Sequence, residues 1–105
     1  MAGRNYNFTF SKKENLRFIS HLDLVRLFQR AFRRAELPVT ITKGFSPRLK
    51  ISIIRALKLG VESDAEEMVV SMDSVIPENE CMERLNAKLP FGVKIHSVKL
   101  LNRSL

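Results

Sequence analysis

Four arginines stand close together in the first third of the chain, and arginine is the side chain best suited to binding phosphate. The guanidinium group is permanently charged, and its planar set of N–H donors matches two phosphate oxygens at once. No acidic residue stands four positions before or after any of the four. The alternative is an ordinary solvated helix face. We predict a polyanion-binding surface made by Arg26, Arg30, Arg33 and Arg34.

A second basic segment surrounds the turn signal Gly44-Phe45-Ser46-Pro47. A large apolar residue in such a turn has little reason to be buried, so Phe45 either stacks on a base, docks a partner or caps the core. The cations beside it can extend the arginine surface, and Arg55 can continue it further. The predicted nucleic-acid-binding residues of this segment are Lys43, Phe45, Arg48 and Lys50.

The charge of the chain is unevenly divided, which favours nucleic acid as the partner. The formal net charge is +7. Residues 1–60 hold thirteen Lys and Arg against three acids, a net of +10, whereas residues 61–105 hold five against eight. A positive patch confined to one part of a chain most often binds nucleic acid, so we expect RNA as the partner.

Catalytic and metal chemistry have few candidates in this sequence. His21 is the only candidate catalytic residue, because the positive end of a helix would keep its imidazole neutral and able to act as a general base; a structural role is the alternative. His21 and Asp23 lack a third metal ligand. Cys81 is the only cysteine, so no disulfide framework or iron–sulfur cluster is possible. We expect no metal and no cofactor.

The same composition indicates a cytoplasmic protein. No apolar run approaches the roughly 18 residues of a membrane span, and the first residues contain no apolar signal core. A single cysteine fits a reducing compartment. With 45% hydrophobic and 28% charged residues, the chain has the balance of a globular protein. We expect one domain over residues 1–105, with no membrane partner.

Hydrophobic periodicity predicts the elements that position these residues. Alternation over Tyr6–Phe10 indicates a strand with one buried face. A capping box at Ser20–Asp23 begins an amphipathic helix, which Pro38 ends. Leu16–Ile19, before it, either pairs back as a hairpin or leads into the helix. The later predicted elements are strands at Leu49–Ile53 and Met68–Met72, a helix from Pro77 to Leu89, and a strand at Val93–Leu101.

This order of elements predicts an α+β fold of the ferredoxin-like, split βαβ type, an antiparallel sheet with two helices on one face. The phase of alternation slips between Ile95 and Val98, which indicates a β-bulge. Residues 58–67 are polar and predict a loop, and the acidic run within it, Glu62 to Glu67, predicts a solvated segment that could also bind a cation or a basic partner.

A family resemblance follows the same residues. It begins with Ser20-His21-Leu22-Asp23-Leu24, Arg26, Phe28, Arg30-Ala31, Arg33-Arg34-Ala35 and Leu37-Pro38, and continues through Gly44-Phe45-Ser46-Pro47, Lys50-Ile51-Ser52, Ala56-Leu57, Leu59-Gly60-Val61-Glu62-Ser63, Glu66, Arg84-Leu85-Asn86 and Leu89-Pro90. With these matches the chain resembles the radical-SAM-linked protein family, a domain of unknown function found beside or fused to cobalamin-type radical SAM proteins. Thr42, Leu49 and Val69 depart from the family's usual Ser, Pro and acid.

The resemblance implies an accessory role beside a radical SAM protein, because the chain has no cysteine triad to hold the cluster itself. We therefore expect a basic module that binds RNA, such as tRNA or rRNA, in support of a radical SAM modifying enzyme. Two alternatives stay open. One is a metal-independent ribonuclease that uses His21; the other is a protein-interaction domain that docks the radical SAM partner.

Overall fold

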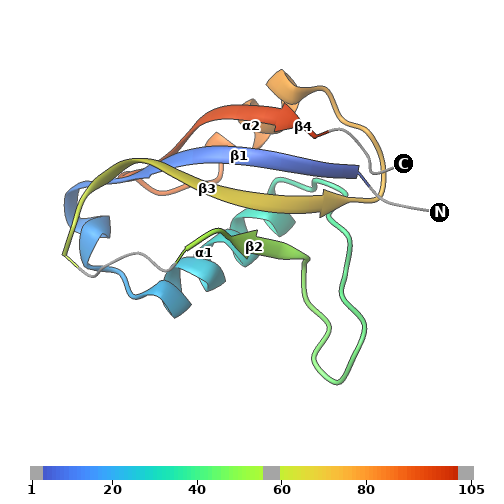
Figure 1. The fold of residues 1–105 in the computed structure, drawn as a ribbon, viewed down its shortest axis with the longest axis horizontal. Coiled ribbons are helices and arrows are strands. Elements are labelled where there is room, and N and C mark those ends of the chain that lie inside the picture. Colours follow the sequence, from blue (N-terminus) through green and yellow to red (C-terminus); the bar gives the residue numbers. More distant parts are fainter. Residues whose placement is uncertain (1–3, 56–59, 102–105) are drawn as a thin grey trace.

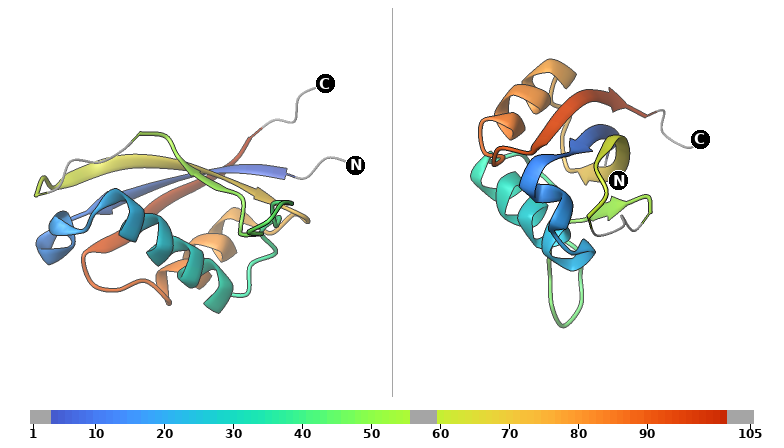
Figure 2. Two further views of the ribbon diagram at one scale, coloured as in Figure 1. Left: turned by 90° about the horizontal axis from the view of Figure 1, so that it is seen from below. Right: turned by 90° about the vertical axis from the view of Figure 1, so that its left-hand side faces the viewer.

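A four-stranded antiparallel sheet with two helices on one face forms the body of the molecule (Figures 1 and 2). The computed structural model describes residues 4–55 and 60–101. The spatial order of the strands is β2-β3-β1-β4, which confirms the predicted ferredoxin-like α+β fold. In chain order the elements are β1 (Arg4–Lys12), the 3-10 helix η1 (Glu14–Phe18), α1 (His21–Arg34), β2 (Ile51–Ile53), β3 (Ser63–Met72), α2 (Glu78–Asn86) and β4 (Val93–Leu100).

The core lies between the sheet and the two helices. Tyr6, Phe8 and Phe10 are fully buried on the helix side of β1, as their alternation with polar residues predicts. The Phe8 ring packs edge-on against Phe32 of α1, with 5.4 Å between centroids, and Phe10 packs in the same way against Phe28 at 5.0 Å. Edge-to-face pairs of this kind stabilise a core beyond their buried area.

The helix α1 begins as its capping signal predicts. The Ser20 hydroxyl accepts a hydrogen bond of 3.1 Å from the backbone N–H of Asp23, which satisfies one of the donors left free at a helix start. Leu24, Phe28 and Phe32 point into the core from the opposite side to the arginines. The preceding segment is the 3-10 helix η1, so Leu16–Ile19 leads into α1 and forms no hairpin.

The predicted bulge in the last strand is confirmed. Along β1, Thr9 pairs with Ser97, but the next residue, Phe10, pairs with Ile95, so His96 is the extra residue on β4. The side chain of Asn86 on α2 holds the backbone beside this bulge. Its amide accepts from the Ile95 N–H at 2.8 Å and donates to the Ile95 carbonyl at 3.1 Å. The Asn86 amide thereby pairs with the backbone N–H and carbonyl that Ile95 presents at the edge of the sheet.

The predicted loop over residues 58–67 is wrong in its second half. Residues 63–67 belong to β3, while residues 58 and 59 lie outside the described part of the chain. Glu66 pairs opposite Phe10 and is only 3% exposed. The Arg55 guanidinium donates two hydrogen bonds of 3.0 and 2.9 Å to its carboxylate, and the Ser63 hydroxyl donates a further one. This neutralisation lets an acidic residue occupy an inward strand position.

Candidate nucleic-acid interface

The outer face of α1 carries all four predicted arginines, and each is exposed. The four arginines differ in the residues around them. Arg26 forms an ion pair of 3.4 Å, between its Nη1 and Oδ1 of Asp23, three residues earlier. The absence of acids at four-residue spacing holds for all four arginines, but this ion pair joins residues three positions apart, so Arg26 is partly neutralised. Arg30 and Arg34 line a hollow whose other wall is residues 87–90, directly after α2.

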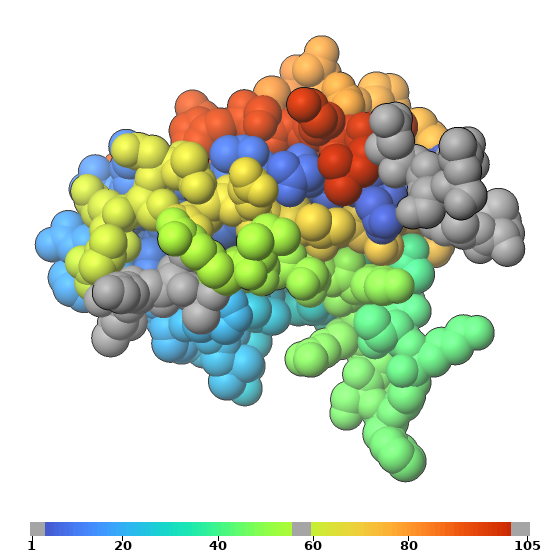
Figure 3. Space-filling model, viewed as in Figure 1, coloured from blue at the N-terminus to red at the C-terminus, as the bar shows by residue number. Residues whose placement is uncertain are grey.

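The second predicted group lies on a projecting hairpin, residues 41–50, called here the basic arm. Ile41 bridges Leu49, and the Thr42 N–H donates to the Arg48 carbonyl at 2.7 Å. Gly44, with φ of 141°, adopts a backbone conformation at the turn that other residues rarely take. The arm stands away from the body of the molecule (Figure 3). The predicted second strand is therefore shorter than expected, because residues 49 and 50 belong to the arm.

The tip of the arm exposes an aromatic side chain. Phe45 is 109% exposed relative to a reference residue, so it does not cap the core. The cations Lys43, Arg48 and Lys50 on the same arm are exposed as well. Arg48 and Lys50 line a hollow of about 370 Å³ that also includes Ser52 and Ser71, on the side of the sheet away from the helices. The arm thus combines a stacking surface with three positive charges.

Gln29 joins the arm to α1. Its side-chain Nε2 donates to the Leu49 carbonyl at 2.9 Å, and its Oε1 accepts from the Leu49 N–H at 3.0 Å. The root of the arm is also hydrogen bonded to β3, because the Thr40 N–H donates to the Ser71 carbonyl at 2.8 Å. Sequence reasoning missed this residue. Its only signal is an amide among arginines on the polar side of the predicted helix.

Arg55 does not extend the basic surface, because it is the ion-pair partner of buried Glu66. The Arg55 guanidinium is the main reason that the pKa of the Glu66 carboxyl lies below its usual value. Lys12 is fully buried nearby, and burial lowers the pKa of its ammonium group. Glu66, within the acidic run after residue 61, is thus a structural residue.

His21 is half-buried at the first turn of α1. Its Nδ1 atom is buried and has no hydrogen-bond partner within residues 4–55 and 60–101. A catalytic base is normally held in orientation by a third group, and this imidazole has none among those residues. The ribonuclease alternative therefore gains no support from the geometry around His21.

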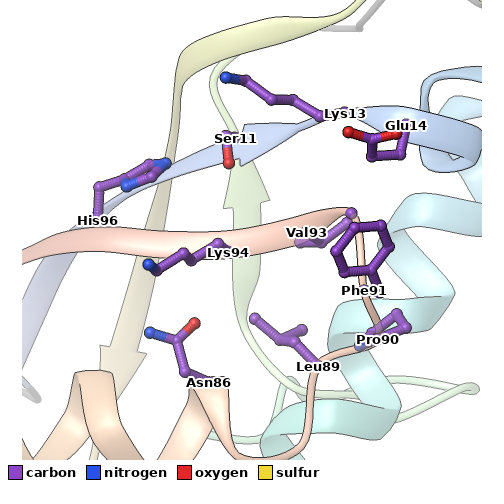
Figure 4. Close-up of a pocket in the computed structure, with 11 residues that line it drawn as sticks. Ser11, Lys13, Glu14, Asn86, Leu89, Pro90, Phe91, Val93, Lys94 and His96 are labelled. Atoms are coloured by element: carbon purple, nitrogen blue, oxygen red, sulfur yellow. The ribbon is translucent and has the colours of Figure 1, made fainter.

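A further hollow of about 380 Å³ lies where β1 and β4 meet the turn before β4 (Figure 4). His96 and Lys94 approach it from β4, and Lys13 from just beyond β1. Lys13 forms an ion pair with Asp64, and the Glu14 carboxylate also lines the hollow. The positive charge of this hollow is therefore largely compensated, in contrast to that of α1 and the arm.

Metal-ligating side chains do not gather anywhere in the described part of the chain: no group of three or more His, Cys, Asp and Glu residues could hold an ion there. Among the same residues, no helix is long and apolar enough to cross a membrane. Cys81 is buried, and burial raises the pKa of its thiol to about 11.

Comparison with known proteins matches nearly the whole chain to one family. Residues 5–104 match the family model described as "Uncharacterized protein conserved in bacteria (DUF2344)". None of the curated proteins matches the chain. The matched range includes α1, the basic arm and α2, so the family model covers every residue of the candidate interface.

Proposed function

We propose that this chain, which belongs to the DUF2344 family of proteins conserved in bacteria, is a cytoplasmic accessory module that binds RNA for a radical SAM modifying enzyme. One observation carries the RNA-binding part. Within residues 4–55 and 60–101, six exposed cations of α1 and the basic arm take part in no ion pair. These cations are Arg30, Arg33, Arg34, Lys43, Arg48 and Lys50.

Uncompensated like charges on one helix repel one another, and this repulsion destabilises the free protein by a few tenths of a kcal/mol per pair. A phosphate backbone removes the repulsion and releases its own condensed counterions, so binding is strongly favoured at low salt. The exposed Phe45 ring adds a flat apolar surface on which an unpaired base can stack. Together these features support RNA over an acidic protein as the ligand.

The radical SAM part of the proposal depends on the family resemblance of the sequence. A module without a cluster-binding cysteine triad supplies substrate binding and leaves the chemistry to its partner. Co-expression with a cobalamin-type radical SAM protein, followed by purification at low salt, tests this part. We expect the two proteins and RNA to purify together. A complex of the two proteins that contains no RNA and survives ribonuclease treatment would favour the protein-docking alternative instead.

The RNA-binding part is tested by the salt dependence of binding to fluorescently labelled bulk tRNA, measured by anisotropy. The slope of log K against log[salt] is negative, and for the double variant Arg30→Ala/Arg33→Ala we expect its magnitude to fall by about 1.4 to 1.8, the value for two lost phosphate contacts. The matched control is Lys94→Ala/Lys99→Ala on β4, which changes the net charge equally. Salt-independent binding, or equal slopes for both double variants, would refute RNA binding through α1.

A further inference from the structure

A basic cleft lies between α1 and the C-terminal end of α2, apart from the basic arm. It consists of two adjoining hollows of about 400 and 470 Å³, which share Arg34, Ala87 and Lys88. Both helices lie on the same face of the sheet (Figure 2), so the cleft opens on the helix side of the molecule. Lys88 was not among the predicted site residues.

The charge in this cleft is positive and poorly compensated. Arg30 and Arg34 line it from α1, Lys88 lines it from the turn after α2, and none of the three takes part in an ion pair within the described residues. Arg84 also lines the cleft, but its guanidinium donates to the carbonyls of Ala35 and Glu36 and pairs with Glu80. Glu36 is the single acid among the lining residues.

The apolar part of the lining strengthens the attraction. Leu27, Ala31, Leu89 and Pro90 complete the hollow next to Arg30. Apolar side chains lower the local dielectric, so a charged group between them and the cations is attracted more strongly than on open surface. Three cations on two walls, with oxygen-matching guanidinium forks on one wall, suit a tetrahedral oxyanion such as phosphate.

The position of the cleft on α1 indicates a polymer as the ligand. At about 100° per residue, Gln29, which holds the arm, and Arg34, which lines the cleft, lie about 140° apart around the helix. Arg33 and then Arg30 fall between them in angle. A ligand in contact with the arm and the cleft therefore crosses the arginine face of α1, and a chain of phosphates can do this where a small molecule cannot.

We propose that this cleft binds a backbone phosphate of the RNA, with Lys88 opposite Arg30 and Arg34, so that the RNA runs from the basic arm across α1 to α2. This inference rests on the proposed RNA binding. It adds a third contact point, Lys88 in the turn after α2, which the charge distribution of the sequence did not indicate, and it sets the direction in which the ligand crosses the molecule.

The test compares Lys88→Ala with Lys99→Ala, an exposed lysine whose strand position faces away from both helices. Binding of labelled bulk tRNA is measured by anisotropy at several salt concentrations, and circular dichroism confirms that both variants fold. We expect Lys88→Ala to lower the magnitude of the salt slope by about 0.7 to 0.9, as for one lost phosphate contact, and Lys99→Ala to leave it unchanged. In the Arg30→Ala background, the effect of Lys88→Ala should shrink, because the two groups share a phosphate.

Two results would refute binding of an RNA phosphate in the cleft and leave the proposed RNA binding intact. The first is a Lys88→Ala slope equal to that of the wild type, while Arg30→Ala/Arg33→Ala still weakens binding. The second is competition by inorganic phosphate at concentrations far below those at which chloride of equal ionic strength competes, which would assign the cleft to a free phosphate. Failure of the wild-type chain to bind tRNA at all would instead refute the proposed function, and the cleft with it.

Discussion

Replacing Gln29 by alanine tests whether one uncharged side chain holds the basic arm against α1. The substitution removes two hydrogen bonds to the backbone of Leu49, which is only 7% exposed. The Leu49 carbonyl keeps a second donor, the N–H of Ile51 at 3.0 Å, so the group left without a partner is the Leu49 N–H. An unsatisfied buried donor costs about 1 to 3 kcal/mol.

We therefore expect Gln29→Ala to lower the free energy of unfolding by about 2 kcal/mol. For a domain of this size, the melting temperature should fall by about 8 °C, at roughly 4 °C per kcal/mol. Urea unfolding and thermal melts followed by circular dichroism measure both quantities. No charge is removed, so the arm still makes its phosphate contacts in the complex and the salt slope of tRNA binding should stay the same. The affinity should fall, because binding must then order the arm.

Amide hydrogen exchange distinguishes a local effect from general destabilisation. In Gln29→Ala, the Leu49 amide should lose protection first. The matched control is Asn86→Ala, which removes the equivalent amide contact on β4 and should expose the Ile95 amide while Leu49 stays protected. If both variants accelerate exchange at the same amides, or if Leu49 exchanges at the wild-type rate in Gln29→Ala, Gln29 does not hold the arm against α1.

Two further predictions concern the tip of the arm and the buried carboxylate. Because the chain has no tryptophan, Phe45→Trp introduces a single tryptophan whose fluorescence RNA should quench. Phe45→Ala should weaken binding about 5-fold to 150-fold, the equivalent of about 1 to 3 kcal/mol per stacked base, and unchanged affinity would exclude stacking. The lowered pKa of Glu66 stabilises the fold above the ordinary Glu value of about 4.3, and this stabilisation is lost as the pH falls through the lowered value. The difference in free energy of unfolding between wild type and Glu66→Gln, measured by urea unfolding, should therefore decrease as the pH is lowered from about 7 to about 3. A difference that does not change with pH would contradict this reasoning.

The elements that sequence reasoning predicted correctly are those set by local patterns. Alternation over Tyr6–Phe10 and the capping signal at Ser20 depend on neighbouring residues alone, and both appear in the structure as expected. The β-bulge at His96 is also visible locally, because one extra residue in β4 shifts the alternation of apolar and polar positions along that strand. Residues 63–67 were not predictable in this way, because Glu66 becomes an inward strand residue only through Arg55, eleven positions earlier.

The same difference between local and long-range interactions separates the site residues that the sequence predicted from those that it missed. The exposure of the arginines follows from the periodicity of α1, but the attachment of the arm does not, because Gln29 bonds to a backbone group twenty residues away. Nothing in its residue type specifies that partner. Lys88 was missed for a different reason: it stands in the mildly acidic part of the chain, and a charge count by halves hides a cation that folding brings beside Arg30 and Arg34.

The distribution of aromatic side chains decides which face of this fold can meet RNA. In the RNA-recognition modules built on a similar four-stranded sheet, aromatic residues on the open face stack the bases. Here the only Phe and Tyr residues of the four strands are Tyr6, Phe8 and Phe10, and all three point into the core. The open face presents polar positions such as Asn7 and Thr9 instead. Phe18 and Phe91 are exposed as well, but Phe45 is the most exposed aromatic ring among the described residues and stands beside the cations of the arm. The cations proposed to contact RNA lie on the arm and on the helix side, so RNA bound as proposed leaves most of the open sheet uncovered.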